Sequence, residues 1–267
     1  MNALAIVLAA AVAVIVAIVG PPLLRQRRRS RLLQSAMAEP DRSLLHATRA
    51  HQRLPLALQP ALEARVRVFL AEQAFIGCAG LSVTRAMRLE IASQACLLLL
   101  GRDRRVYDQL RSILVYPDGF LVPRSDYADG VVTEYELPVS GESRGTANVI
   151  LAWRDVAAAN PRCSPVIHEF AHYLDHEEGA TGGSWTRGGR RGAARWARVM
   201  GCAFAKLQRE VEAGRETLLE EDALENETEF FAFATEAFFE SARELAADDP
   251  ELYAELARYY RLDPAAW

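Results

Sequence analysis

The chain has 267 residues, of which 51% are hydrophobic and 25% are charged. This length and composition fit one globular domain with an appendage, and they exclude an intrinsically disordered chain. The formal net charge is −4, yet five arginines precede residue 32: Arg25, Arg27, Arg28, Arg29 and Arg31. The rest of the chain is therefore acidic. Since nucleic-acid-binding proteins carry their positive charge on the folded domain, we expect no nucleic-acid partner.

Residues 1–24 contain no charged side chain, and residues 3–19 are an unbroken apolar run. Together with residues 20–24, this run reaches the ~20 apolar residues that cross a bilayer. A cleaved signal peptide has a positive segment before its apolar run, and none is present here. The pattern therefore favours an uncleaved transmembrane anchor over a cleaved export signal.

The arginines at residues 25–31 follow the apolar run, and positive residues that flank a membrane span stay in the cytoplasm. We therefore expect a single-pass protein of the inner (cytoplasmic) membrane, with the N-terminus outside and the main domain facing the cytoplasm. The predicted division is an anchor at 1–24, a basic juxtamembrane tether at 25–52 and a domain at 53–267. The tether's arginines can also contact anionic lipid headgroups.

Periodicity in the remaining chain places helices on both sides of a short β-rich region. Apolar residues recur at helical spacing over residues 59–73, and Thr84 can cap a second helix that ends at Gly101. Between residues 111 and 153, β-rich runs alternate with turn signals and predict a sheet of three to five strands. Further helices are expected at roughly 163–178, 192–213, 227–241 and 250–261. This order predicts an α+β fold with a small central sheet flanked by helices.

The segment PVIHEFAHYLDHEEG, residues 165–179, contains the pattern HExxH as His168, Glu169 and His172. On a helix the two histidines lie on one face, where two imidazoles can bind one Zn²⁺ at ~2.0–2.1 Å. Zinc lowers the pKa of a bound water toward ~7, and Glu169 is placed to take its proton as the water attacks a carbonyl. The alternative is a surface helix with two ordinary histidines.

A catalytic zinc needs a third protein ligand and one open position. His176 follows His168 by eight residues, roughly 12 Å along a helix axis, and no glycine breaks the helix before Gly179. We therefore do not expect His176 to bind. Asp175 lies on the face of His172 and suits a hydrogen bond to a ligand histidine better than direct ligation.

The third ligand is then expected on a later helix, within ENETEFFAFATEAFFES at residues 225–241. Phenylalanines would bury much of this helix, and a buried carboxylate must be paired or bound to metal. Asn226 and Glu229 also form a near-capping box, so Glu229 could instead bond to the start of its own helix. Spacing alone leaves the choice open among five acids: Glu225, Glu227, Glu229, Glu236 and Glu240.

Several blocks resemble the Mlc titration factor A family of zinc metallopeptidases, among them VIHEFAHYLD, ETEFFAFATEAFFE and PELYAELARYYRLDP. The resemblance covers about residues 53–264 and implies a zincin-like domain with a single zinc ion. Carried over by position, it implies His168 and His172 as zinc ligands and Glu169 as the base. It also implies Glu229 as the third ligand and Glu236 as a residue that supports the ligands.

The resemblance further implies peptide-bond hydrolysis, aminopeptidase-like in the best-known member, which also binds a glucose-responsive transcriptional repressor. We therefore expect a zinc-dependent peptidase that acts on a peptide or protein. The alternative is a weakly active zinc-binding module that regulates a protein partner such as a transcriptional regulator. Asp222 favours the alternative, because the family commonly has a tyrosine at this place, seven residues before the glutamate ligand.

Neither the identity of the substrate nor that of a protein partner follows from these patterns. One segment is nevertheless a candidate for binding the substrate backbone. The strand ANVILAW, residues 147–153, precedes the HExxH helix. If it lies at the edge of the sheet, it can pair with an extended peptide.

Overall fold

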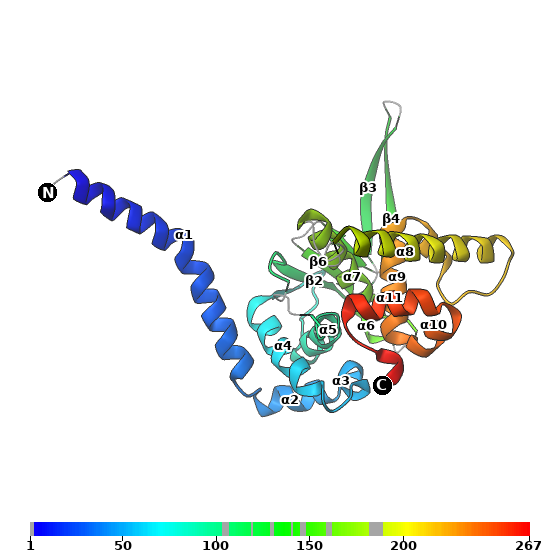
Figure 1. The fold of residues 1–267 in the computed structure, drawn as a ribbon, viewed down its shortest axis with the longest axis horizontal. Helices are drawn as coiled ribbons and strands as arrows, with labels where there is room; N and C mark the ends of the chain where they lie inside the picture. The colour runs from blue at the N-terminus through cyan, green and yellow to red at the C-terminus, as the bar shows by residue number, and fades with distance from the viewer. Residues whose placement is uncertain are drawn as a thin grey trace.

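The structure is a computed structural model that describes residues 3–102, 107–118, 120–128, 131–139, 141–144, 148–158, 162–181 and 189–267. Its first element, α1 (Ala3–Gln34), is a helix with Pro21 and Pro22 inside it. The N-terminal part of α1 extends away from the rest of the molecule, and its C-terminal part approaches the helices of the body (Figure 1). The helix thus continues past the boundary predicted at residue 24.

Among the residues that the structure describes, none of the helices combines the length and the apolar character that crossing a membrane requires. This finding does not support the transmembrane helix predicted at residues 1–24, which stays a prediction.

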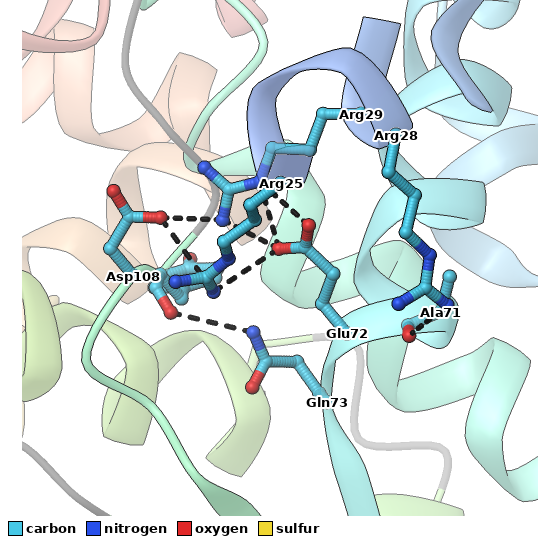
Figure 2. Close-up of polar contacts among 8 residues, drawn as sticks. Arg25, Arg28, Arg29, Ala71, Glu72, Gln73 and Asp108 are labelled. Carbon is cyan, nitrogen blue, oxygen red and sulfur yellow. Dashed lines mark hydrogen bonds and ion pairs between the residues drawn. The ribbon is translucent and has the colours of Figure 1, made fainter. Parts of the chain in front are cut away.

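Two of the arginines that follow the apolar run, Arg25 and Arg29, contact carboxylates of the domain (Figure 2). The Nε atom of Arg29 donates to both carboxylate oxygens of Glu72, at 2.7 and 2.9 Å. Its Nη2 atom lies 2.5 Å from a carboxylate oxygen of Asp108. Arg25 lies 3.4 Å from Glu72 as well. Glu72 ends α4 (Gln59–Glu72), so part of the predicted tether is a helix docked on α4. Contact of these arginines with lipid headgroups would have to displace these ion pairs.

After α1, the N-terminal half of the chain has three helices before the first strand: α2 (Glu39–His46), α3 (Arg49–Arg53) and α4. A further helix, α5 (Arg85–Leu97), follows that strand. The cap predicted at Thr84 is confirmed, because its hydroxyl accepts a hydrogen bond from the N–H of Met87 at 3.2 Å. Helix α5 ends at Leu97 and not at Gly101. Its buried apolar side chains join those of α4 in the core.

The main sheet has the strand order β1-β2-β6-β5, in which the first three strands are parallel and β5 is antiparallel to β6. The strands are β1 (Ala74–Gly77), β2 (Ser112–Tyr116), β6 (Asn148–Ala152) and β5 (Gly141–Arg144). A separate antiparallel pair, β3 (Phe120–Ala128) and β4 (Val131–Val139), protrudes from the body (Figure 1). The prediction of a small sheet is confirmed in part: β2 and β6 belong to it, whereas the runs that became β3 and β4 form the separate pair. The sequence patterns did not indicate β1, and they read the segment of β5 as a turn.

The C-terminal half is helical, with α6 (Trp153–Ala157), α7 (Pro165–Thr181), α8 (Gly189–Glu212), α9 (Glu227–Glu240), α10 (Ala242–Asp248) and α11 (Pro250–Tyr260). Two short 3₁₀ helices, η2 (Glu221–Leu224) and η3 (Pro264–Ala266), complete it. The four helices predicted here are confirmed within a few residues at each end, and α6 and α10 are additional. The molecule is a mixed, helix-rich fold around a small sheet.

Helix α7 lies in the middle of this fold and packs against α5, α9, β5 and β6. Its apolar side chains are fully buried: Val166, Ile167, Phe170, Ala171 and Leu174. Phe170 contacts the ring of Tyr107, with 4.8 Å between the ring centroids. Because one face of α7 is fixed in the core, its opposite face, with the two histidines of the HExxH pattern, is held against α9.

Candidate metal centre

The start of α7 is fixed by its first residues. Ser164 precedes Pro165, and its hydroxyl accepts a hydrogen bond from the N–H of Ile167 at 3.1 Å. A serine cap followed by proline at the first helical position is a favoured helix start. The register of α7 then places His168 and His172 one turn apart on the same face.

Helix α9 brings its acids to that face. Asn226 caps α9, because its side-chain oxygen accepts hydrogen bonds from the N–H groups of Thr228 and Glu229, at 2.9 and 3.0 Å. The carboxylate of Glu229 lies against His168 and His172. The capping-box alternative for Glu229 is therefore not what the structure adopts. The cap is made by Asn226, and the Glu229 carboxylate points across to α7.

The structure brings His168, His172 and Glu229 together in a nearly equilateral triangle. The Nε2 atoms of the two histidines are 3.1 Å apart. The Oε2 atom of Glu229 is 3.2 Å from Nε2 of His168 and 3.3 Å from Nε2 of His172. A tetrahedral zinc with bonds of ~2.0 Å has ligand atoms roughly 3.3 Å apart. The three edges of the triangle match that separation, so these residues fit a zinc ion.

The chemistry and burial of the three side chains agree with this geometry. Two imidazoles and one carboxylate form the His₂Glu set of catalytic zinc sites, in which the fourth position stays open for water or substrate. The side chains of His168, His172 and Glu229 are 16%, 13% and 27% exposed. They are thus largely shielded from solvent, and part of each side chain remains exposed. This group could hold a metal ion.

Glu236 lies behind the triangle. One of its oxygens is 3.3 Å from Nδ1 of His168, on the side of the ring away from Glu229. Its other oxygen accepts a hydrogen bond from the N–H of Ser164. Glu236 is almost fully buried, so this carboxylate is held by both contacts. The structure therefore places Glu236 where a residue that orients a ligand histidine belongs.

The remaining site candidates lie on α7. Glu169 directly follows His168 and is buried. Asp175 is half-buried, and its predicted hydrogen bond to His172 stays a prediction. His176 is exposed and is not part of the ligand group found among the described residues, in keeping with its exclusion by helix geometry.

The charges of the site favour a cation at the triangle. Burial would lower the pKa of His168, but hydrogen bonds to Glu229 and Glu236 raise the pKa to about 10. Burial would raise the pKa of Glu229, but hydrogen bonds to His168 and His172 hold this pKa well below its ordinary value. The carboxylates thus stabilise a positive charge on the imidazole of His168, and a metal cation would meet the same field.

Two residues at the site were not anticipated. Ser164 anchors both the start of α7 and Glu236, and the ring of Phe233 packs edge-on against His168 at 4.7 Å between centroids. The Ser-Pro pair at 164–165 is a helix-start signature that would have identified the serine. Phe233 carries no comparable signal, because it is one of several phenylalanines on α9.

The structure does not meet the condition under which β6, the strand within residues 147–153, could pair with a peptide substrate. β6 is not an edge strand, because β2 pairs with one side of it and β5 with the other. The main sheet instead ends at β5 among the strands described. Since β5 also packs against α7, it is the strand that combines an unpaired edge, among the strands described, with proximity to the helix of the HExxH pattern.

Comparison with known proteins places most of the chain in one family of metallopeptidases. Residues 24–261 match the model of a family described as glucose-regulated metallo-peptidase M90. The chain is 39% identical over 209 residues to the uncharacterized protein slr2042 of Synechocystis sp. (strain ATCC 27184 / PCC 6803 / Kazusa), covering 76% of each chain. It is 29% identical over 203 residues to Mlc titration factor A of Yersinia pestis (strain Pestoides F), covering 74% of this chain and 75% of that protein. The match to Mlc titration factor A of Yersinia pseudotuberculosis (serotype O:1b, strain IP 31758) has the same values.

Proposed function

Because the chain belongs to the glucose-regulated metallo-peptidase M90 family, we propose that it is a zinc-dependent peptidase. The observation that carries this proposal is the triangle of ligand atoms from His168, His172 and Glu229, whose edges of 3.1, 3.2 and 3.3 Å suit one tetrahedral zinc ion. In this assignment the three side chains are the zinc ligands and the fourth position receives the reactants.

The residues around the triangle have separate roles in this proposal. Zinc, when bound, supplies a Lewis acid that polarises a carbonyl and acidifies water. Glu169, buried beside the first ligand, accepts the proton of the attacking water and passes it to the leaving amine. Glu236 accepts the Nδ1 proton of His168, which leaves the lone pair of Nε2 directed to the triangle.

The substrate in this proposal is an extended segment of a peptide or protein. An extended chain can add to the open side of β5 by backbone hydrogen bonds, which would place it alongside α7. Such pairing uses backbone groups and depends little on side chains, so in this proposal other residues near the triangle set the cleavage preference.

Chelation and one substitution test the activity. Purified protein should hydrolyse members of a mixed pool of short peptides, followed by mass spectrometry. A chelator should abolish this turnover, and added zinc should restore it. Glu169→Gln should keep its zinc and lose about 10²–10⁴-fold in turnover, the contribution typical of a general base. His176→Gln, which changes an exposed histidine of the same helix, should behave as the wild type.

Full zinc occupancy without chelator-sensitive turnover of any short peptide would reject the peptidase. It would favour the second candidate, a zinc-binding module that regulates a protein partner such as a transcriptional regulator. Asp222 motivates this candidate, because it is an exposed aspartate where the resemblance implies a tyrosine. The name of the relative Mlc titration factor A also points to such a partner. In that case the wild type and Glu169→Gln should bind the regulator with equal affinity.

The cellular location is a separate proposal, supported by the apolar run of residues 3–19 and the arginines after it. We place the chain in the inner membrane as a single-pass protein with its N-terminus outside and its catalytic domain in the cytoplasm. Protease added to sealed inside-out vesicles should then digest the domain. Protection of the domain in these vesicles would overturn this orientation, and recovery of the chain without membranes would overturn the anchor.

A further inference from the structure

A second group of side chains with metal-ligand chemistry lies away from α7 and α9, where α2, α3 and α4 meet (Figure 1). It consists of His46, the last residue of α2, His51 in α3 and Glu63 in α4. We propose that these residues bind a second divalent transition-metal ion of the zinc type, which joins the three helices.

The separations of the ligand atoms fit one ion. The Oε1 atom of Glu63 is 3.0 Å from Nε2 of His46 and 4.0 Å from Nε2 of His51. These two distances bracket the roughly 3.3 Å between ligands of a tetrahedral zinc with ~2.0 Å bonds. The two imidazole rings are stacked, with 4.3 Å between centroids. The side chain of His46 is 46% exposed, so its ring can turn toward an incoming ion.

His51 supplies a second, independent observation. Its side chain is only 6% exposed, and its Nε2 atom has no hydrogen-bond partner among the described residues. Buried polar atoms are nearly always paired, so this atom needs an explanation. The nearest carboxylate oxygen, on Glu63, is too far for a hydrogen bond but close enough to share a metal ion. An ion pair between His46 and Glu63 alone would account for the position of His46. It would leave the buried Nε2 atom of His51 without a hydrogen-bond partner in the described part of the chain.

The charges around Glu63 are consistent with this arrangement. Its second oxygen, Oε2, lies 3.6 Å from Nε of Arg42, which leaves Oε1 to the two histidines. Two imidazoles and one carboxylate oxygen suit zinc, cobalt, nickel or copper, whereas calcium and magnesium prefer oxygen ligands. Because the ligands come from three helices, a bound ion would hold α2 and α3 against α4.

Metal stoichiometry of the full-length protein tests the proposal, with zinc as the probe. After equilibrium dialysis against micromolar free zinc, the wild type should hold two ions per chain. His46→Gln and His172→Ala should each hold one, and the double variant should hold none. His176→Gln, an exposed histidine in neither group, should hold two. Since His46 is exposed, its variant is expected to fold even if a variant of the buried His51 does not.

Cobalt then separates the two sites by spectroscopy. In the His172→Ala variant, added cobalt should give the visible absorption of a tetrahedral nitrogen and oxygen site, and zinc should raise the melting temperature. Both effects should disappear when His46→Gln is added to that variant. An ion count that His46→Gln leaves unchanged, in the wild type and in His172→Ala alike, would overturn the proposal. One ion in the wild type that is lost in His46→Gln would instead mean that the group on α7 and α9 is the one without zinc.

Discussion

Nδ1 of His168 lies 3.3 Å from one oxygen of Glu236, and the other oxygen of this carboxylate accepts a hydrogen bond from the N–H of Ser164. One buried side chain of α9 therefore holds both the first histidine of the HExxH pattern and the first turn of its helix. Glu229, seven residues earlier on α9, completes the triangle on the other side of the same ring. Two carboxylates of α9 thus position His168 from both of its nitrogens.

This relationship predicts the effect of Glu236→Gln. A glutamine has one oxygen, so it cannot accept from both His168 and Ser164, and the imidazole should lose part of its orientation. We expect zinc affinity to fall about 10–100-fold, as for other residues that support metal ligands. A competing chelator measures this affinity. Glu227→Gln, an exposed acid at the start of the same helix, is the matched control and should leave affinity unchanged. Equal affinity of the two variants would contradict the role given to Glu236.

The half of the site on α7 was predictable because its chemistry is local. Helical spacing alone places His168 and His172 on one face and excludes His176. Glu229 is different, since its contact with His168 spans 61 residues and depends on how α9 packs across α7. Spacing left five acids open, and only the resemblance selected Glu229. The pair His46 and His51 gave no signal, because the break between α2 and α3 determines how their rings meet.

Strands were harder to predict than helices for physical reasons. β1 has only four residues and directly follows α4, so its sequence is too short to show an alternating pattern. Substrate binding by β6 required an edge position, but its continuous apolar sequence is typical of a strand with neighbours on both sides. The pairing of β5 with β6 could not be read from the sequence, because Gly141–Arg144 is short and polar.

The charges at the triangle predict the pH dependence of the metal-free protein. His168 has a pKa of about 10, above its ordinary 6.5, so its contribution to stability is full below pH 6.5 and is lost as the pH rises through 10. Glu229 has a pKa below its ordinary 4.5, so its contribution is present above pH 4.5 and is lost as the pH falls. In chelator, urea unfolding should therefore show decreasing stability from pH 6.5 to 10.

The same experiment with variants identifies the source of this slope. Glu229→Gln removes one partner of the imidazolium of His168, so the decrease above pH 6.5 should become smaller. Glu227→Gln should keep the wild-type slope, because this acid is exposed outside the triangle. An unchanged slope in Glu229→Gln would assign the pH dependence to other groups.

Docking of α1 on the domain depends on Arg29, whose side chain is 12% exposed between Glu72 and Asp108 (Figure 2). Arg29→Ala leaves the largely buried Glu72 without its main partner. Because Arg25 still lies 3.4 Å from Glu72, we expect the free energy of unfolding to fall by about 2 kcal/mol, the contribution of one hydrogen bond to a charged group. Hydrogen exchange in the C-terminal part of α1 should become faster.

Arg27→Ala is the matched control, since Arg27 is an exposed arginine of the same helix. Its effect on stability should stay within about 0.5 kcal/mol, as for other surface substitutions. If both variants exchange at the same rate as the wild type, α1 is not held by Arg29.

Asp222 provides a test of transition-state stabilisation. It is exposed on η2, which packs against α9, the helix that carries Glu229. The resemblance implies a tyrosine at this place, and a hydroxyl donor to a developing oxyanion typically contributes 10²–10³-fold in turnover. Asp222→Tyr should therefore raise kcat/KM for short peptides by about tenfold or more, with zinc affinity unchanged. Glu221→Tyr, which adds the same ring to the neighbouring exposed position, should have no such effect. Wild-type turnover in Asp222→Tyr would mean that another group of the cleft already stabilises the oxyanion, because the added hydroxyl would then have no charge left to bind.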